Sequence, residues 1–151
     1  GKDMERLAIG SDHAGYEMKL KIIDYLKGKG YECVDFGTYS ADSCNYAEYG
    51  IAVGKAVASG EFRKGILICG TGVGISISAN KVNGIRAVVC SEPLSAKMSR
   101  EHNDSNILAF GSRIVGIELA KMIVDEWLAA EFQGGRHANR VATITEYEQN
   151  R

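Results

Sequence analysis

The sequence of 151 residues has little proline, little tryptophan and no excess of charge of either sign. It contains one Pro, one Trp, 18 basic and 19 acidic residues, and its formal net charge is -1. A protein that binds nucleic acid usually has a strongly basic face, and this balance gives no sign of such a partner. Any cationic site is therefore expected to be small and local.

Long apolar runs are also missing. No stretch approaches the roughly 20 apolar residues of a membrane-spanning helix. The N-terminus also lacks the charged segment followed by an apolar segment that is typical of a secretory leader. We therefore expect a cytoplasmic protein without a membrane partner. Residues 1–3 precede Met4 and are interpreted as a cloning remnant, so the expected domain is 4–151.

The sequence has no Cys-x-x-Cys pair, and its cysteines fit no zinc-ligand spacing. A cytoplasmic chain keeps its thiols reduced. We therefore expect no metal site and four free thiols, those of Cys33, Cys44, Cys69 and Cys90.

What is present is an ordinary globular composition, with 45% hydrophobic and 25% charged residues. These values exclude a disordered or collagen-like chain. The length suffices for one domain with a substantial core and is short for two. A single domain is expected.

The apolar pattern alternates between short buried strands and amphipathic helices. Strands are expected at 5–10, 31–36, 65–69, 86–90 and 106–110, and helices at 16–27, 46–59, 75–82, 93–102 and 116–131, followed by a helical tail from about 135. This alternation is typical of a parallel sheet covered by helices on both faces. The expected fold is a three-layer α/β/α, Rossmann-like domain with a five-stranded parallel sheet and a C-terminal helical tail.

Helical spacing also predicts which residues face the core. In the first helix these are Tyr16, Leu20, Ile23 and Leu26. In the fifth helix they are Leu119, Met122, Ile123, Trp127 and Ala130.

In a parallel α/β sheet, functional groups gather at the carboxyl ends of the strands. The segments that follow the strands here are rich in reactive residues: SDHAG after the first, CGTGVG around the end of the third, Ser91 and Glu92 after the fourth, and GSR after the fifth. The site is expected at this edge of the sheet.

The glycines after the third strand resemble a phosphate-binding turn, but their spacing fits no nucleotide motif. Gly70, Gly72 and Gly74 form GxGxG in the third strand–helix unit, whereas a dinucleotide fingerprint is GxGxxG, normally in the first unit. A Walker loop would need GK[ST], which is missing. Two interpretations of this turn remain: a tight turn whose glycines serve packing, or an anion-binding site. The second is possible because glycines let the backbone approach a ligand and the amides at a helix start stabilise negative charge.

Cys69 ends a buried strand directly before this turn. Such a cysteine is often only a small core residue. A helix N-terminus, however, stabilises a thiolate, and a thiolate beside amide donors can take a proton from carbon while the donors hold the oxyanion. Cys90 also ends a strand but has no glycine turn, so it is interpreted as structural.

Two of the three histidines neighbour acidic or amide residues, an arrangement suited to acid–base chemistry near neutral pH. His13 follows Asp12, and His102 precedes Asn103. In the tail, Arg136 and Arg140 are four residues apart, so on a helix they share a face on which they can bind a phosphate or simply contact solvent.

Five segments, in this order, resemble the ribose/galactose phosphate isomerase family and, within it, the type B ribose-5-phosphate isomerases. They are SDHAG (11–15), CGTGVGISISANK (69–81), SREHNDSN (99–106), FGSR (110–113) and FQGGRHANR (132–140). The resemblance runs from Met4 to the tail. It implies interconversion of D-ribose 5-phosphate and D-ribulose 5-phosphate through a cis-enediolate, without metal or organic cofactor.

The resemblance also implies a role for each matched residue. Cys69 matches the catalytic base, and His102 matches the acid that opens the furanose ring. Asp12 matches a group near the sugar hydroxyls, while Thr71 and the backbone of Gly70, Gly72, Val73 and Gly74 match the groups that hold the oxyanion. The phosphate contacts are His13, Arg113, Arg136 and Arg140, and the sugar contacts are Tyr46 and Asn103.

Members of the family are dimers, sometimes tetramers, whose active sites lie between subunits. By this resemblance, His102 would face Cys69 of a second copy. Some members use a glutamate shortly after the glycine turn as the base, but Ile75 stands at that position here, so the sequence fits the branch that uses cysteine.

The nearest alternative function is isomerisation of allose 6-phosphate or galactose 6-phosphate. Alternatives of another class are a non-catalytic nucleotide-binding module and an inert structural domain.

Overall fold

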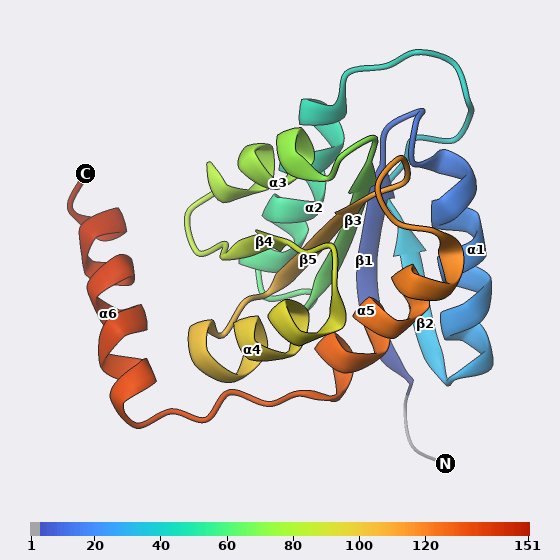
Figure 1. The fold of residues 1–151 in the computed structure, drawn as a ribbon. Coiled ribbons are helices and arrows are strands. Elements are labelled where there is room, and N and C mark those ends of the chain that lie inside the picture. Colours follow the sequence, from blue (N-terminus) through green and yellow to red (C-terminus); the bar gives the residue numbers. More distant parts are fainter. Residues whose placement is uncertain (1–3) are drawn as a thin grey trace.

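Five parallel strands form one sheet in the order β2-β1-β3-β5-β4 (Figure 1). The computed structural model describes residues 4–151, and the interpretation of residues 1–3 lies outside the described residues. The strands are β1 (Glu5–Ser11), β2 (Tyr31–Asp35), β3 (Gly65–Cys69), β4 (Ala87–Val89) and β5 (Ile107–Gly111). The helices are α1 (Tyr16–Gly28), α2 (Tyr46–Ala58), α3 (Val73–Asn80), α4 (Pro93–Asn103), α5 (Ile117–Ala129) and α6 (Arg136–Gln149). The predicted fold class is confirmed.

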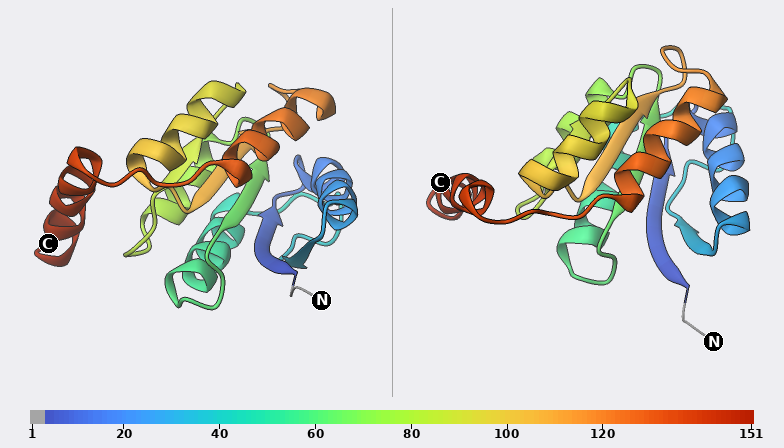
Figure 2. Two further views of the ribbon diagram at one scale, coloured as in Figure 1. Left: turned by 90° about the horizontal axis from the view of Figure 1, so that it is seen from below. Right: turned by 60° about the horizontal axis from the view of Figure 1, so that its bottom comes forward.

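The sheet has a hydrophobic core on each face, which is why its central strands read as continuous apolar runs. Leu7, Ile66 and Leu108 belong to the core on the face covered by α1, α4 and α5, whereas Ala8 and Leu67 belong to the core under α2 and α3. Figure 2 shows the two helical layers on opposite sides of the sheet. All residues of β3 and β5 are buried, so the loops at their ends are built on a rigid base.

The buried faces of two helices differ from the prediction by a small rotation. Leu20 of α1 and Met122 of α5 were expected in the core but are 45% and 56% exposed. In α1 the core position is taken by Lys19, because its ammonium finds polar partners inside the protein. In α5 the indole of Trp127 donates a hydrogen bond to Ser105 Oγ (2.9 Å), which holds the helix in its observed rotation.

The C-terminal helix α6 stands away from the sheet, beyond α4, at the end of an extended segment (Figures 1 and 2). It has no buried residue. The carboxylate of Glu148 accepts a hydrogen bond from the amide of Gly84 (3.0 Å), and α6 contacts α4. None of the helices within residues 4–151 has the length and apolar character needed to cross a membrane.

Candidate active site

The thiol of Cys69 lies at the start of α3, as predicted. Cys69 is the last residue of β3 and is 5% exposed. The amide of Gly72 donates a hydrogen bond to its Sγ at 3.1 Å. An N–H group directed at sulfur, together with the N-terminus of a helix, stabilises negative charge on that sulfur. The geometry therefore favours a reactive thiol.

Gly72 brings the turn into close contact with the neighbouring strand. Its φ is +83°, in the left-handed region, and a Cβ added there would lie 2.7 Å from the carbonyl carbon of Phe110. Both the backbone conformation and the space therefore require glycine. The turn that presents Gly72 to the thiol is set by this contact with β5.

We expect Gly72→Ala to lower the free energy of unfolding by about 3 kcal/mol, because strain at positive φ adds to a backbone clash. Gly60→Ala is the matched control, since Gly60 has φ +87° but no atom within 4 Å of the added Cβ. It should cost only about 1 kcal/mol. Urea unfolding of both variants measures the difference, and equal losses would contradict the role given to the Phe110 contact.

Hydrogen bonds join the loop after β5 to the loops after β3 and β1. The amides of Ser112 and Arg113 donate to the carbonyls of Cys69 and Gly70, both at 2.9 Å. The Ser112 hydroxyl donates to the carbonyl of Ala14 at 2.8 Å. The guanidinium of Arg113 lies over Gly70, with Nη1 3.4 Å from the position of an added Cβ. Arg113 therefore places a positive charge beside the turn.

The loop after β1 contributes Asp12 and His13 to the same edge. Asp12 is 6% exposed, and its Oδ1 accepts a hydrogen bond from the amide of Gly15 at 3.0 Å. His13 Nδ1 accepts from the amide of Cys44 at 3.2 Å. Because Nδ1 is an acceptor, the proton of the neutral ring is assigned to Nε2, which makes Nε2 a donor for a substrate oxygen.

Two further predicted residues complete this group. The ring of Tyr46, at the start of α2, lies against Gly74, where an added Cβ would be 2.8 Å from Cε2. Thr71 is exposed, and its Oγ1 accepts from the amide of Val73 at 3.2 Å. The structure thus gathers the residues predicted after β1 and β3, together with Tyr46 and Arg113, at the carboxyl edge of the sheet. Ile75 is fully buried.

The other predicted residues lie at the opposite, amino edge of the sheet. His102 and Asn103 end α4 shortly before β5 begins, whereas Cys69 pairs with Gly111 at the other end of β5. A strand of five residues separates the two edges by on the order of 15 Å. One chain therefore does not bring His102 to its own Cys69.

At the amino edge, His102 meets the start of α6. Its ring stacks on that of His137, with centroids 4.3 Å apart and planes inclined by 10°. Arg136 and Arg140 lie on α6 with His137. Desolvation, followed by the charges of His102 and these two arginines, lowers the pKa of His137. His102, Arg136 and Arg140 therefore form a second, cationic group.

We expect His137 to titrate below its ordinary pKa of 6.5. A histidine whose pKa is lowered by folding stabilises the fold above the unfolded pKa, and this stability is lost as the pH falls through the lower folded pKa. The contact between α4 and α6 should accordingly weaken in acid. NMR titration of the His137 ring measures the pKa, and His102→Gln should raise it, while Lys21→Met on α1 should not. A midpoint at or above 6.5 in the wild-type chain would contradict this account.

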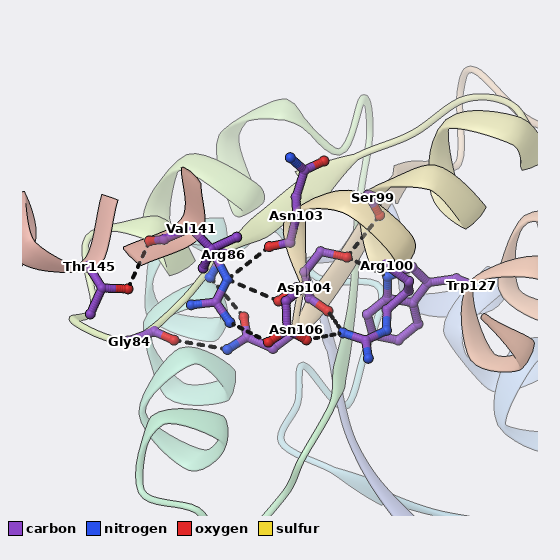
Figure 3. Close-up of polar contacts among 11 residues, drawn as sticks. Gly84, Arg86, Ser99, Arg100, Asn103, Asp104, Asn106, Trp127, Val141 and Thr145 are labelled. Carbon is purple, nitrogen blue, oxygen red and sulfur yellow. Dashed lines mark hydrogen bonds and ion pairs between the residues drawn. The ribbon is translucent and has the colours of Figure 1, made fainter. Parts of the chain in front are cut away.

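A network that the sequence analysis did not identify holds the end of α4 (Figure 3). Asp104 caps the helix at φ +48°, and its carboxylate lies between Arg86 (3.4 Å) and Arg100 (3.0 Å). Arg86 Nε also donates to the carbonyls of Asn103 (3.1 Å) and Asp104 (2.9 Å). Because Arg86 is distant in sequence from Asn103 and Asp104, no local pattern predicts that this network fixes His102 and Asn103.

Lys19 was also missed, because a lysine in an amphipathic helix normally indicates the exposed face. It is fully buried, its Nζ donates to Asp35 Oδ1 at 2.7 Å, and it also donates to the carbonyl of Thr38. These bonds fix the start of the loop that leads to Cys44 and Tyr46. Lys19 therefore helps to position Cys44 and Tyr46 at the carboxyl edge of the sheet.

The four cysteines within residues 4–151 are free thiols, as predicted. Burial, with a smaller effect of a nearby carboxylate, raises the pKa of Cys33 and of Cys90 to about 11. These two thiols stay protonated at neutral pH, which agrees with a structural role for Cys90. In the part of the chain that the structure describes, His, Cys, Asp and Glu side chains form no group of three or more suited to a metal ion.

The fold and this arrangement define a parallel α/β protein with a glycine turn beside a buried thiol. Comparison with known proteins specifies it further. Residues 7–144 match the family model described as Ribose/Galactose Isomerase. The chain belongs to the Ribose/Galactose Isomerase family, which confirms the predicted family of aldose–ketose isomerases.

Individual relatives cover nearly the whole chain. Ribose-5-phosphate isomerase B of Escherichia coli is 59% identical over 148 residues, covering 98% of this chain and 99% of that protein. D-erythrulose-4-phosphate isomerase of Pectobacterium atrosepticum is 43% identical, covering 96% of each chain. The structure of ribose-5-phosphate isomerase B from Clostridium thermocellum has 59% identity and a TM-score of 0.95, covering 96% of this chain and 98% of that one.

Proposed function

We propose that this protein interconverts D-ribose 5-phosphate and D-ribulose 5-phosphate, with Cys69 as the base. The observation that carries the proposal is the hydrogen bond from the Gly72 amide to Cys69 Sγ at the start of α3. The Cys69 thiolate takes the proton from C2 of the open-chain aldose, and the electron pair moves to the carbonyl oxygen to form a cis-enediolate. Return of this proton to C1 and transfer of the 2-hydroxyl proton to O1 give the ketose, so no external oxidant, reductant or proton is consumed.

The remaining carboxyl-edge residues serve this step. Thr71 and the amides of Gly70 to Gly74 hold the developing oxyanion, which is stabilisation by donors already in place. Asp12 lies near the sugar hydroxyls, and Tyr46 contacts the sugar. His13 and Arg113 bind the phosphate, with His13 donating from Nε2. Metal and organic cofactors have no part in the proposed reaction.

The separation of the two edges supports an active site shared between subunits. We propose a cytoplasmic homodimer in which His102 of one copy opens the furanose ring for Cys69 of the other. Asn103 contacts the sugar, and Arg136 and Arg140 complete the phosphate site. The projecting helix α6, which has no buried residue in the single chain, is suited to carry these arginines to a second copy.

The substrate is tested by measuring kcat/KM side by side on ribose 5-phosphate, allose 6-phosphate and galactose 6-phosphate. The name of the Pectobacterium relative adds D-erythrulose 4-phosphate to this set. We expect the highest value for ribose 5-phosphate. A higher kcat/KM for another sugar phosphate would assign that substrate instead. If NAD or ATP alone raised the melting temperature and no sugar phosphate were turned over, a nucleotide-binding module would be favoured.

A further inference from the structure

A cationic hollow lies at the amino edge of the sheet, apart from the carboxyl-edge group. Two adjoining hollows, of about 510 and 280 Å³, share Arg63, Lys64, Arg100 and Asp104 in their walls. Arg63 and Lys64 directly precede β3, whose far end carries Cys69. The hollow is therefore separated from the thiol by the length of the strand.

Positive charge exceeds negative charge in the smaller part of this hollow, whereas Glu5 and Glu131 balance the cations of the larger part. The smaller part is lined by four cationic side chains, those of Arg63, Lys64, Arg86 and Arg100, and by one carboxylate, that of Asp104. Figure 3 shows Asp104 between Arg86 and Arg100, so its charge is already matched. Within residues 4–151, neither Arg63 nor Lys64 forms an ion pair.

Lys64 is surrounded by charges of both signs. Desolvation lowers its pKa; among the nearby charges, Glu5 has the largest effect and raises the pKa, Arg100 and Arg63 lower it, and Glu131 raises it. An anion placed between these cations would relieve their mutual repulsion.

Arg100 is a nearly buried cation of this hollow. Its side chain is 10% exposed, and its Nη1 donates to Asp104 Oδ1 and to the carbonyl of Ser105. Its Nε is buried and has no partner. An unpaired buried donor is costly, and it commonly marks the place of an ion or water. Arg100 lines both hollows, so its guanidinium charge contributes to the wall of the same site.

We propose that this hollow binds a phosphate group, either inorganic phosphate or the phosphate of a small metabolite, at a site separate from Cys69 and the carboxyl-edge group. With Asp104 matched, three positive charges remain in the smaller hollow, which suits a phosphate dianion better than a carboxylate. Arginine forks and a lysine are also the side chains that bind phosphate oxygens most effectively. The inference does not depend on the proposed function.

The test uses Trp127, the single tryptophan of the chain, as a reporter. Lys64 Nζ lies 5.9 Å from the centre of its ring, and its indole N–H gives one NMR signal. Inorganic phosphate is titrated into the full chain at constant ionic strength, with acetate as the comparison anion. The NMR signals of the indole N–H and of the backbone amides of residues 63, 64 and 100 are followed.

The test variant is the double substitution Arg63→Gln/Lys64→Met, and Arg63→Gln alone is a milder variant. Lys55→Met, an exposed lysine of α2, and Arg113→Gln at the carboxyl edge are the controls.

We expect a saturable shift with phosphate and none with acetate. The dissociation constant should rise at least about tenfold in the double variant, and less in Arg63→Gln. It should be unchanged in both controls. Absence of saturation in the wild-type chain, an equal response to acetate, unchanged affinity in the Arg63 and Lys64 variants, or loss of the signal in Arg113→Gln would overturn the proposal. A ribose 5-phosphate titration of the same variants distinguishes a metabolite phosphate from free phosphate.

Discussion

Replacing Cys69 with alanine is expected to lower kcat for ribose 5-phosphate by about 10³-fold, within the range found when a general base is removed. The proposed isomerisation requires transfer of the C2 proton, and the neighbouring Ile75 has no group that can take this proton. Exchange of the C2 hydrogen of the substrate with solvent deuterium should fall in parallel. Steady-state kinetics and NMR of the sugar phosphate in D₂O measure the two effects.

Cys90→Ala is the matched control for Cys69→Ala. Both cysteines are 5% exposed in the core and lie near the carboxyl end of a strand, so both variants should lose similar stability. The Cys90 thiol, whose pKa is raised to about 11, has no acid–base role at neutral pH, and its removal should leave kcat within about twofold of the wild-type value. Near-normal turnover in Cys69→Ala, or equal losses in the two variants, would reject Cys69 as the base.

Mixing two inactive chains is expected to restore activity if the active site is shared. In a heterodimer of Cys69→Ala and His102→Gln chains, one site combines both substitutions and the other contains neither. Random reassociation makes half of the dimers heterodimers, so the mixture should recover about one quarter of the wild-type activity. Each variant alone should retain at most about one hundredth, given the usual contribution of a general acid or base.

The control mixes two variants whose substitutions fall on the same edge. Cys69→Ala with Arg113→Gln should show no recovery if both residues come from one subunit, because each of the two sites in a heterodimer would still lack one of them. Each mixture is assayed first before its subunits exchange, when neither mixture should be active. It is assayed again after the two chains have been denatured and refolded together. A mixture of the Cys69 and His102 variants that stays inactive, although the chains exchange, would place His102 outside the partner's site.

Local sequence patterns determine some features of this fold but not others. The apolar run GILIC and the glycine turn after it predict the end of β3 and the placement of Cys69 at the start of α3, because both depend on residues close in sequence. The buried faces of α1 and α5 were predicted less well. There the polar partners of Lys19 and Trp127, which lie elsewhere in the chain, determine the rotation of each helix.

The sequence alone was enough to predict the alternating elements, the reactive carboxyl ends of the strands and the family, since all of these follow from periodicity and from motifs of a few adjacent residues. Only the tertiary structure decided the strand order β2-β1-β3-β5-β4, the separation of His102 from Cys69 and the ion pair between Asp104 and Arg86. These features come from pairing between segments distant in the chain, whose contacts depend on packing rather than on any local pattern.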